Sequence, residues 1–169
     1  MNTLIAEPIP ACQSEAKPVR EKLKVRTILV PIDFSAPSEK ALSYAVPLAE
    51  QFHAKIVLLH VCQERFYGTE FAYLPVEESA VNWAAVDRMK LIASKKIAPE
   101  LLGEIIVRHG VAFEEIATVA KELEAELIIV NTHGYTGLKH VLVGSTAERV
   151  IRHAPCPVLV VRGCEEATD

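Results

Sequence analysis

The residues best suited to binding chemistry gather in one glycine-bearing stretch, residues 131–147. An aliphatic run at residues 128–130 precedes it and predicts a buried parallel strand that ends near Thr132. Three glycines follow, at Gly134, Gly137 and Gly144. A new helical pattern begins at Ser145, directly after the last of them. The predicted order is therefore strand, glycine loop and helix start.

The predicted helix start at Ser145 supports two interpretations. The unpaired N–H groups and the positive dipole end of a helix N-terminus suit a phosphate group. Alternatively, the run Ser145-Thr146-Ala147-Glu148 fits a capping box, in which Ser145 accepts a bond from a nearby amide and Glu148 reaches back. Both can hold together, so the local pattern leaves phosphate binding and a plain capped connection open.

The same stretch resembles the nucleotide-binding loop of the universal stress protein family, whose ATP-binding members show G-x-x-G, nine residues, then G-[ST]. Gly134, the residues 135–143 and the pair Gly144-Ser145 match that spacing. Asn131 stands where the pattern has its first glycine. Asparagine tolerates a positive φ better than most residues, but its side chain can crowd or hydrogen-bond the space that a glycine leaves open.

Other motifs extend the resemblance over residues 26–162. Residues 27–35 look like the family's first strand with its Asp, residues 58–61 look like the second strand, and residues 154–161 look like the closing strand. On these separated motifs, the chain is identified as a member of the family. The resemblance implies a single open, mainly parallel five-stranded α/β sheet of order 3-2-1-4-5, Rossmann-like, with helices on both faces.

Strand and helix patterns alternate along the domain, which also favours a mainly parallel sheet covered on both faces. The predicted strands are 27–31, 55–61, 104–109, 127–132 and 157–161. The predicted helices are one that starts at Ser35 to Pro37 and kinks at Pro47, one over 76–102, one over about 113–123 and one over 145–153. For the second helix, the predicted core stripe is Trp83, Val86, Met89, Ala93 and Ile97. In the implied strand order, Asp33 and the glycine loop converge at the topological switch point.

The resemblance implies an adenine nucleotide site at this switch point. Pro31, Asp33 and Val61 would border the adenine and ribose. The residues that would hold the ribose and phosphates are Asn131, Thr132, His133, Gly134, Tyr135, Thr136, Gly137, Gly144, Ser145, Thr146 and Ala147. ATP is the implied cofactor, with Mg²⁺ or Mn²⁺ arriving on its phosphates. From the local sequence alone, Asp33 fits a cap or turn residue equally well.

Several other nucleotide signatures are absent from the sequence. There is no G-x-x-x-x-G-K-[ST] loop and no G-x-G-x-x-G, which disfavours a P-loop hydrolase and a dinucleotide oxidoreductase. The histidines show no metal-binding spacing. His133, Lys139 and His140 are the nearby candidates for phosphoryl chemistry. Three functions stay open: an ATP-dependent dimeric stress-response switch, a nucleotide-free dimeric scaffold, and a slow ATPase or phosphotransferase.

Length and composition predict one globular domain of residues 26–162, a flexible N-terminal extension of residues 1–25, and a C-terminal tail of residues 163–169. A net charge of −4 argues against nucleic-acid binding. No apolar run approaches the roughly 20 residues of a membrane span, and no signal-peptide pattern is present, so a cytoplasmic protein is expected. Four cysteines without a C-x-x-C motif predict free thiols.

Two further segments suggest contacts. The apolar last strand, residues 157–161, has no charge that would prevent edge pairing, and the resemblance suggests that two copies pair it antiparallel in a homodimer. Residues 62–75 hold Phe66, Tyr67, Phe71 and Tyr73. These rings fit a lid over a base, a partner surface, or a cover for the domain itself.

Overall fold

The computed structural model describes residues 23–62, 78–132 and 144–162. Most of the predicted N-terminal extension, the aromatic segment from residue 63, the loop from His133 to Val143 and the predicted tail lie outside the described residues. The predictions for those segments stay predictions. None of the helices in the described ranges is long and apolar enough to cross a membrane.

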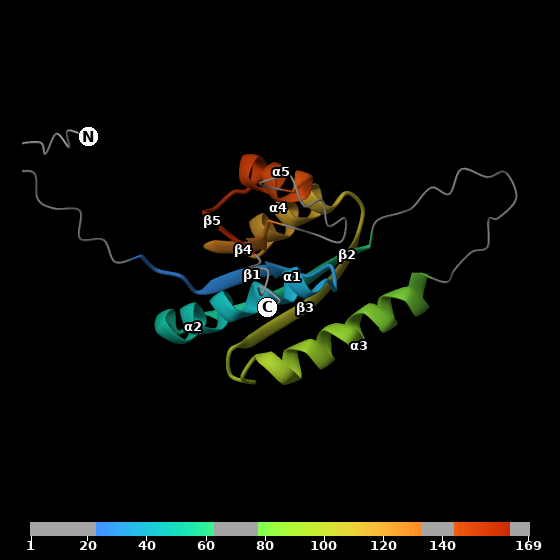
Figure 1. The fold of residues 1–169 in the computed structure, drawn as a ribbon, viewed down its shortest axis with the longest axis horizontal. Coiled ribbons are helices and arrows are strands. Elements are labelled where there is room, and N and C mark those ends of the chain that lie inside the picture. Colours follow the sequence, from blue (N-terminus) through green and yellow to red (C-terminus); the bar gives the residue numbers. More distant parts are fainter. Residues whose placement is uncertain (1–22, 63–77, 133–143, 163–169) are drawn as a thin grey trace, which may run out of the picture.

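The described elements alternate between strand and helix, as the sequence predicts. In chain order they are β1 (Thr27–Pro31), α1 (Ala36–Lys40), α2 (Leu42–Phe52), β2 (Lys55–Cys62), α3 (Glu78–Lys96), β3 (Leu102–His109), α4 (Ala112–Glu122), β4 (Leu127–Asn131), α5 (Ser145–His153) and β5 (Val158–Val161). The strands form one sheet of order β3-β2-β1-β4-β5, and every pairing is parallel (Figure 1). The predicted fold class and strand order are confirmed.

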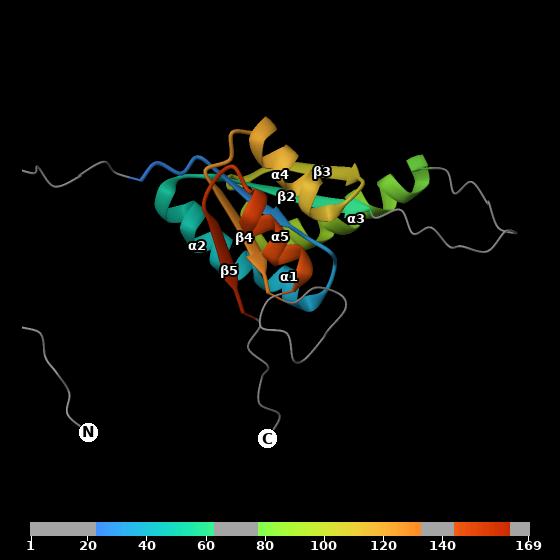
Figure 2. The same cartoon turned by 90° about the horizontal axis from the view of Figure 1, so that it is seen from above.

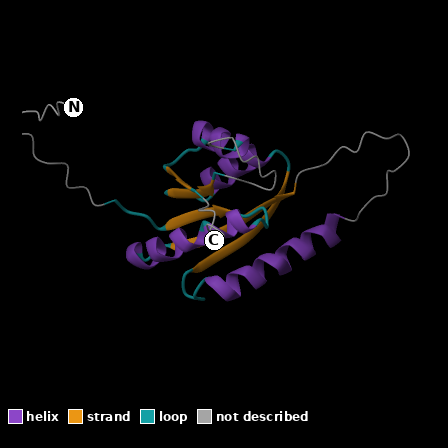
Figure 3. Ribbon diagram, in the orientation of Figure 1, coloured by secondary structure: helices purple, strands orange, loops and turns teal. Residues whose placement is uncertain are grey.

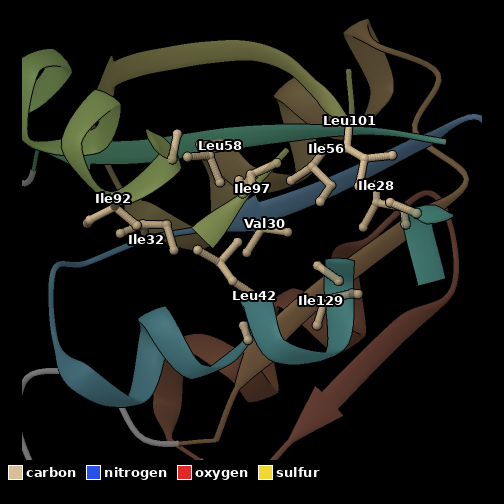
Figure 4. Packing of buried hydrophobic residues seen from close by; sticks show 14 of the residues in the cluster. Ile28, Val30, Ile32, Leu42, Ile56, Leu58, Ile92, Ile97, Leu101 and Ile129 are labelled. Atoms are coloured by element: carbon tan, nitrogen blue, oxygen red, sulfur yellow. The ribbon is translucent and has the colours of Figure 1, made fainter. Parts of the chain in front are cut away.

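The core consists of two apolar layers, one on each face of the sheet. Helices α1, α2 and α3 cover one face, and α4 and α5 cover the other (Figures 2 and 3). Figure 4 shows the first layer, in which Ile28 and Val30 of β1 pack with Leu42 of α2 and Ile92 of α3. Because β1 is buried on both faces, it tolerates only apolar side chains along its centre. This rigid centre fixes the positions of the loops at the strand ends.

The first predicted helix is divided into two helices, α1 and α2, on either side of Ala41. Pro47, the predicted kink position, lies inside α2. The N–H of Ala41 bonds to the carbonyl of Ser38, three residues back, and the N–H of Tyr44 bonds to Ala41 in the same way. These tighter turns end α1 and redirect the chain. The chain that follows β1 therefore enters a short helix, α1, which is separate from α2.

Helix α3 ends earlier than predicted. Met89, Ala93 and Ile97 of the predicted core stripe are buried, whereas Val86 is half-buried and Trp83 is exposed. Pro99 disfavours helical geometry at the residue before it, so α3 ends at Lys96 and β3 begins at Leu102. Trp83, predicted in the core, is 65% exposed. The buried positions are Ala85, Met89, Ile92 and Ala93. Since these follow i, i+4, i+7 and i+8 spacing, they form one face, and Trp83 lies away from it.

Both cysteines in the described part of the chain, Cys62 and Cys156, carry free thiols, as predicted. Burial raises the pKa of the Cys62 thiol. Burial, and then the Glu126 carboxylate, raise the pKa of Cys156. Because the thiolate is the reactive form, both thiols are less reactive at neutral pH than an ordinary cysteine.

Glu126 joins the starts of β1 and β4. Its carboxylate accepts bonds from the backbone N–H groups of Arg26 at 3.1 Å and Thr27 at 2.9 Å, and from Arg26 Nε at 2.9 Å. Burial raises the pKa of Glu126, but the bonds from Arg26 and Thr27 outweigh burial, and the pKa lies below its ordinary value.

We expect Glu126→Gln to lower the free energy of unfolding by about 1 kcal/mol at pH 7, because the backbone N–H groups of Arg26 and Thr27 then donate to a neutral amide oxygen and not to a charged carboxylate. A depressed folded pKa stabilises the fold above the unfolded pKa, and this contribution disappears as pH falls through the folded pKa. The difference between variant and wild type should therefore shrink below pH 4.5, the ordinary glutamate value. Urea denaturation at pH 7 and at successively lower pH measures this difference in the free energy of unfolding.

Glu104→Gln, which changes an exposed carboxylate on β3, is the control. A difference that stays constant with pH would contradict the prediction.

Candidate functional site

The carboxyl ends of β1 and β4 meet at the switch point of the sheet, because these two parallel strands are neighbours. Nδ2 of Asn131, at the end of β4, donates a hydrogen bond of 2.6 Å to the carbonyl of Pro37 in α1. Since α1 begins three residues after Asp33, this bond connects the end of β4 with the turn that follows β1. The end of β4, from which the predicted glycine loop continues, therefore lies beside the turn that holds Asp33, while the loop itself lies outside the described residues.

Asp33 lies in a turn that its own carboxylate stabilises. The backbone N–H of Ser35 donates to Asp33 Oδ1 at 3.0 Å, and the Ser35 hydroxyl donates to the same oxygen. The Ser35 hydroxyl oxygen in turn accepts from the N–H of Ser38 and caps α1. The turn role predicted as one alternative for Asp33 is therefore present. These bonds also hold the Asp33 carboxylate in a defined orientation just beyond the carboxyl end of β1.

Thr132 fixes the start of α5. It is 2% exposed, its N–H donates to the Val161 carbonyl at 3.0 Å, and its own carbonyl accepts from the N–H of Gly144 at 2.7 Å. A Cβ atom at position 144 would stand 2.8 Å from the Thr132 oxygen. Only glycine permits this approach of two backbone segments. Thr132 and Gly144 thus place the first turn of α5 beside the end of β4.

The capping-box interpretation of Ser145 is wrong. Gly144 occupies the N-cap position of α5 with φ −64° and ψ 148°, and it has no side-chain oxygen that could cap the helix. Glu148 is displaced from the capping position by one residue, and its Oε1 accepts from Arg152 at 2.8 Å instead. The physical reason is the bond between Gly144 and Thr132, which sets where the helix begins. Because Ser145 and Thr146 are exposed, the first turn of α5 faces the surface.

Asn131 and α5 lie on opposite sides of the sheet. Ile129, two residues before Asn131, packs in the layer under α1 and α2. Ala147 and Val150 of α5 pack in the other layer. The amide nitrogen of Asn131 is directed at α1 rather than at the start of α5. The Asn131 amide nitrogen is therefore engaged with α1, on the face of the sheet opposite to α5.

The remaining predicted site residues divide into two groups. Pro31 and Val61 are half-buried at the ends of β1 and β2. The predicted ligands His133, Gly134, Tyr135, Thr136 and Gly137, and the candidates Lys139 and His140, lie outside the described residues. Among the residues that are described, no group of three or more His, Cys, Asp or Glu side chains could hold a metal ion.

Three residues near the Asp33 turn were missed by the sequence interpretation. The rings of Phe34 and His60 lie 4.3 Å apart between centroids, and the guanidinium of Arg88 lies 4.4 Å from the Phe34 ring centre. Nδ1 of His60 donates to the Ile32 carbonyl at 2.7 Å, since a carbonyl can only accept. The position of Phe34 directly after Asp33 is a signal that could have identified it from the sequence. Arg88 is 54 positions further on, and nothing in its helical pattern marks it.

A surface hollow of about 570 Å³ lies elsewhere, between α1, the first half of α2 and the end of α3. It is bordered by the ion pair of Lys96 with Glu39, whose atoms are 2.8 Å apart. Its lining includes none of Asp33, Asn131 and Gly144. The region that contains Asp33, Asn131 and Gly144 therefore remains the better candidate site.

The model of the universal stress protein family matches residues 24–162. The chain belongs to the universal stress protein family. Two relatives support this assignment at the level of sequence. Universal stress protein MJ0531 of Methanocaldococcus jannaschii is 35% identical over 146 residues, 81% of this chain and 82% of the relative. Universal stress protein YxiE of Bacillus subtilis is 35% identical over 144 residues, 80% of this chain and 97% of the relative.

Solved universal stress proteins share the fold. UspA from Lactobacillus plantarum has a TM-score of 0.68 at 30% identity, with 83% of this chain and all of UspA covered. Two more distant structures, at 21% and 19% identity, have TM-scores of 0.57 and 0.55. The first is a universal stress protein in complex with cAMP, and the second is the protein from Archaeoglobus fulgidus in complex with dAMP. At such identities the likeness establishes the fold alone.

Proposed function

We propose that this chain is an ATP-binding regulatory protein of the cytoplasmic stress response, which acts as a nucleotide-dependent dimeric switch. The observation that carries the proposal is the start of α5. Gly144 holds it against Thr132, its N-cap has no side-chain oxygen, and its first two residues, Ser145 and Thr146, are exposed. A helix N-terminus of this kind suits phosphate. Family members that bind cAMP and dAMP support an adenine nucleotide as the ligand class.

In this proposal, different residues at the strand ends and at the start of α5 would contact each part of ATP. The backbone N–H groups from Gly144 to Ala147 would take the phosphates, together with the loop from Asn131 to Gly137. The oriented Asp33 carboxylate would accept from ribose hydroxyls, while Pro31 and Val61 would border the adenine. Mg²⁺ or Mn²⁺ would arrive on the phosphates. ATP would be held by backbone N–H groups and by the fixed Asp33 carboxylate. The signal would therefore be the presence of bound ATP and not its hydrolysis.

We expect ATP to bind wild type and Asn131→Gly with affinities within about threefold of each other, because the Asn131 amide is directed at α1. Isothermal titration calorimetry with and without Mg²⁺ measures both affinities. Binding only by Asn131→Gly would mean that Asn131 closes the site, which favours a nucleotide-free dimeric scaffold. Failure of both proteins to bind any adenine nucleotide would overturn the proposal. Hydrolysis of labelled ATP at about 1 per second would favour the enzyme alternative.

The proposed dimer rests on β5, an edge strand of the sheet. The carbonyls of Pro157 and Val161 accept from β4. Successive residues of a parallel strand direct their backbone groups to alternate sides, so Leu159 faces β4 with Pro157 and Val161, while Val158 and Val160 present theirs to the open edge. A second copy of β5, antiparallel across a two-fold axis, would satisfy these groups.

A further inference from the structure

We infer that Arg88 of α3 is a positioning residue for Asp33 and acts on it through the ring of Phe34. The inference deepens the proposed nucleotide site and rests on it where affinity for ATP is the readout. It adds a residue from α3, the helix that connects β2 and β3, and links this helix to the turn that follows β1.

Phe34 adopts a backbone conformation that it does not favour by itself. Its φ is +66°, in the left-handed region where bulky residues are rare. Such a conformation persists only when surrounding contacts hold it. Asp33 is the adjacent residue, and the bonds from Ser35 to its carboxylate close the same turn. The orientation of Asp33 therefore depends on whatever holds Phe34.

Two elements hold Phe34. From β2, the ring of His60 lies against it with centroids 4.3 Å apart and planes inclined at 37°. From α3, the Arg88 guanidinium lies 4.4 Å from the ring centre, and Nη2 makes a long hydrogen bond of 3.4 Å to the Phe34 carbonyl. Arg88 thus contacts both the side chain and the backbone of Phe34.

The residue before Asp33 is fixed as well. Ile32 is 2% exposed, its N–H donates to the Leu59 carbonyl at 2.8 Å, and its carbonyl accepts from His60 Nδ1. The chain is therefore anchored to β2 on one side of Asp33 and held through Phe34 on the other. Of these contacts, Arg88 is the exposed one on a separate helix, so it can be changed without touching the core.

A double-mutant cycle tests this role. The variants are Arg88→Gln, Phe34→Leu and their combination, with Lys90→Gln as an exposed control on the same helix and Phe34→Tyr as the variant that keeps the ring. We expect Arg88→Gln to weaken ATP binding about three- to fivefold and Phe34→Leu about tenfold. In the Phe34→Leu background, Arg88→Gln should have a clearly smaller effect, because only the long bond to the backbone carbonyl of residue 34 remains. Phe34→Tyr and Lys90→Gln should bind as wild type.

Equal losses from Arg88→Gln in both backgrounds would overturn the inference, because Arg88 would then act on the nucleotide directly. No loss in either background would overturn it too. A second readout does not need nucleotide: hydrogen exchange at the Ser35 N–H, which donates to Asp33. Exchange should be faster in Arg88→Gln and Phe34→Leu and unchanged in Lys90→Gln. If wild type binds no ATP, the proposed function fails, and unchanged exchange in Arg88→Gln would overturn the inference independently.

Discussion

Gly144→Val is expected to weaken ATP binding by at least about a hundredfold, equivalent to about 2.7 kcal/mol. A Cβ atom at this position would stand 2.8 Å from the Thr132 oxygen, so the start of α5 must move away from β4. The movement breaks the bond of 2.7 Å between Gly144 and Thr132 and displaces the N–H groups proposed to hold the phosphates. Isothermal titration calorimetry measures the loss.

Ser145→Ala is the matched control for this variant. Ser145 is exposed and is the first helical residue rather than the N-cap, so its removal leaves the helix start where it is. We expect a loss of less than about fivefold, from the hydroxyl alone. Circular dichroism and thermal unfolding test whether both variants remain folded. Binding of ATP by Gly144→Val at wild-type affinity would show that the start of α5 does not hold the phosphates.

The second large effect concerns assembly. Leu159→Lys should shift the protein from dimer to monomer at micromolar concentration, because it places a charge in the apolar edge strand. Val160→Pro should do the same by another route, since it removes an N–H that faces the open edge while the bonds of Pro157 and Val161 to β4 remain. Analytical ultracentrifugation measures the mass of each variant.

A matched control for the assembly test lies on the other edge of the sheet. Glu104 is exposed on β3, so Glu104→Lys places a positive charge at the other edge of the sheet, as Leu159→Lys does at β5, without touching β5. This variant should remain dimeric. A wild type that is strictly monomeric at micromolar concentration would contradict the proposed dimer, whatever the variants do.

The sheet could be predicted because its signals are local and repeated. Aliphatic runs such as residues 28–30 and 128–130 are buried on both faces, and their alternation with helical patterns leaves few arrangements. The errors arose where one residue overrides a pattern. Pro99 shortens α3, and the apolar character of Trp83 suggested a core position that the helix geometry does not give it.

The candidate site was only partly predictable for a different reason. The sequence placed Asp33 just beyond a strand end and Gly144 directly before a helix, but side-chain directions depend on distant segments. The bond of Asn131 to Pro37 spans 94 positions, and the contact of Arg88 with Phe34 spans 54. Likewise, Ser145 has the composition of an N-cap, and only the approach of Gly144 to Thr132 moves the cap by one residue.

The bond network between Arg26 and Glu126, which are 100 positions apart, also has a kinetic consequence. The central strand β1 pairs with both β2 and β4. Of these two neighbours, β4 is absent until most of the domain has been synthesised. Residues up to β3 can associate early, but they leave one edge of β1 open. Parallel pairings of such sequence separation are slow to form. The closure of β4 onto β1 should therefore be a late event in refolding, and Glu126 should report on it.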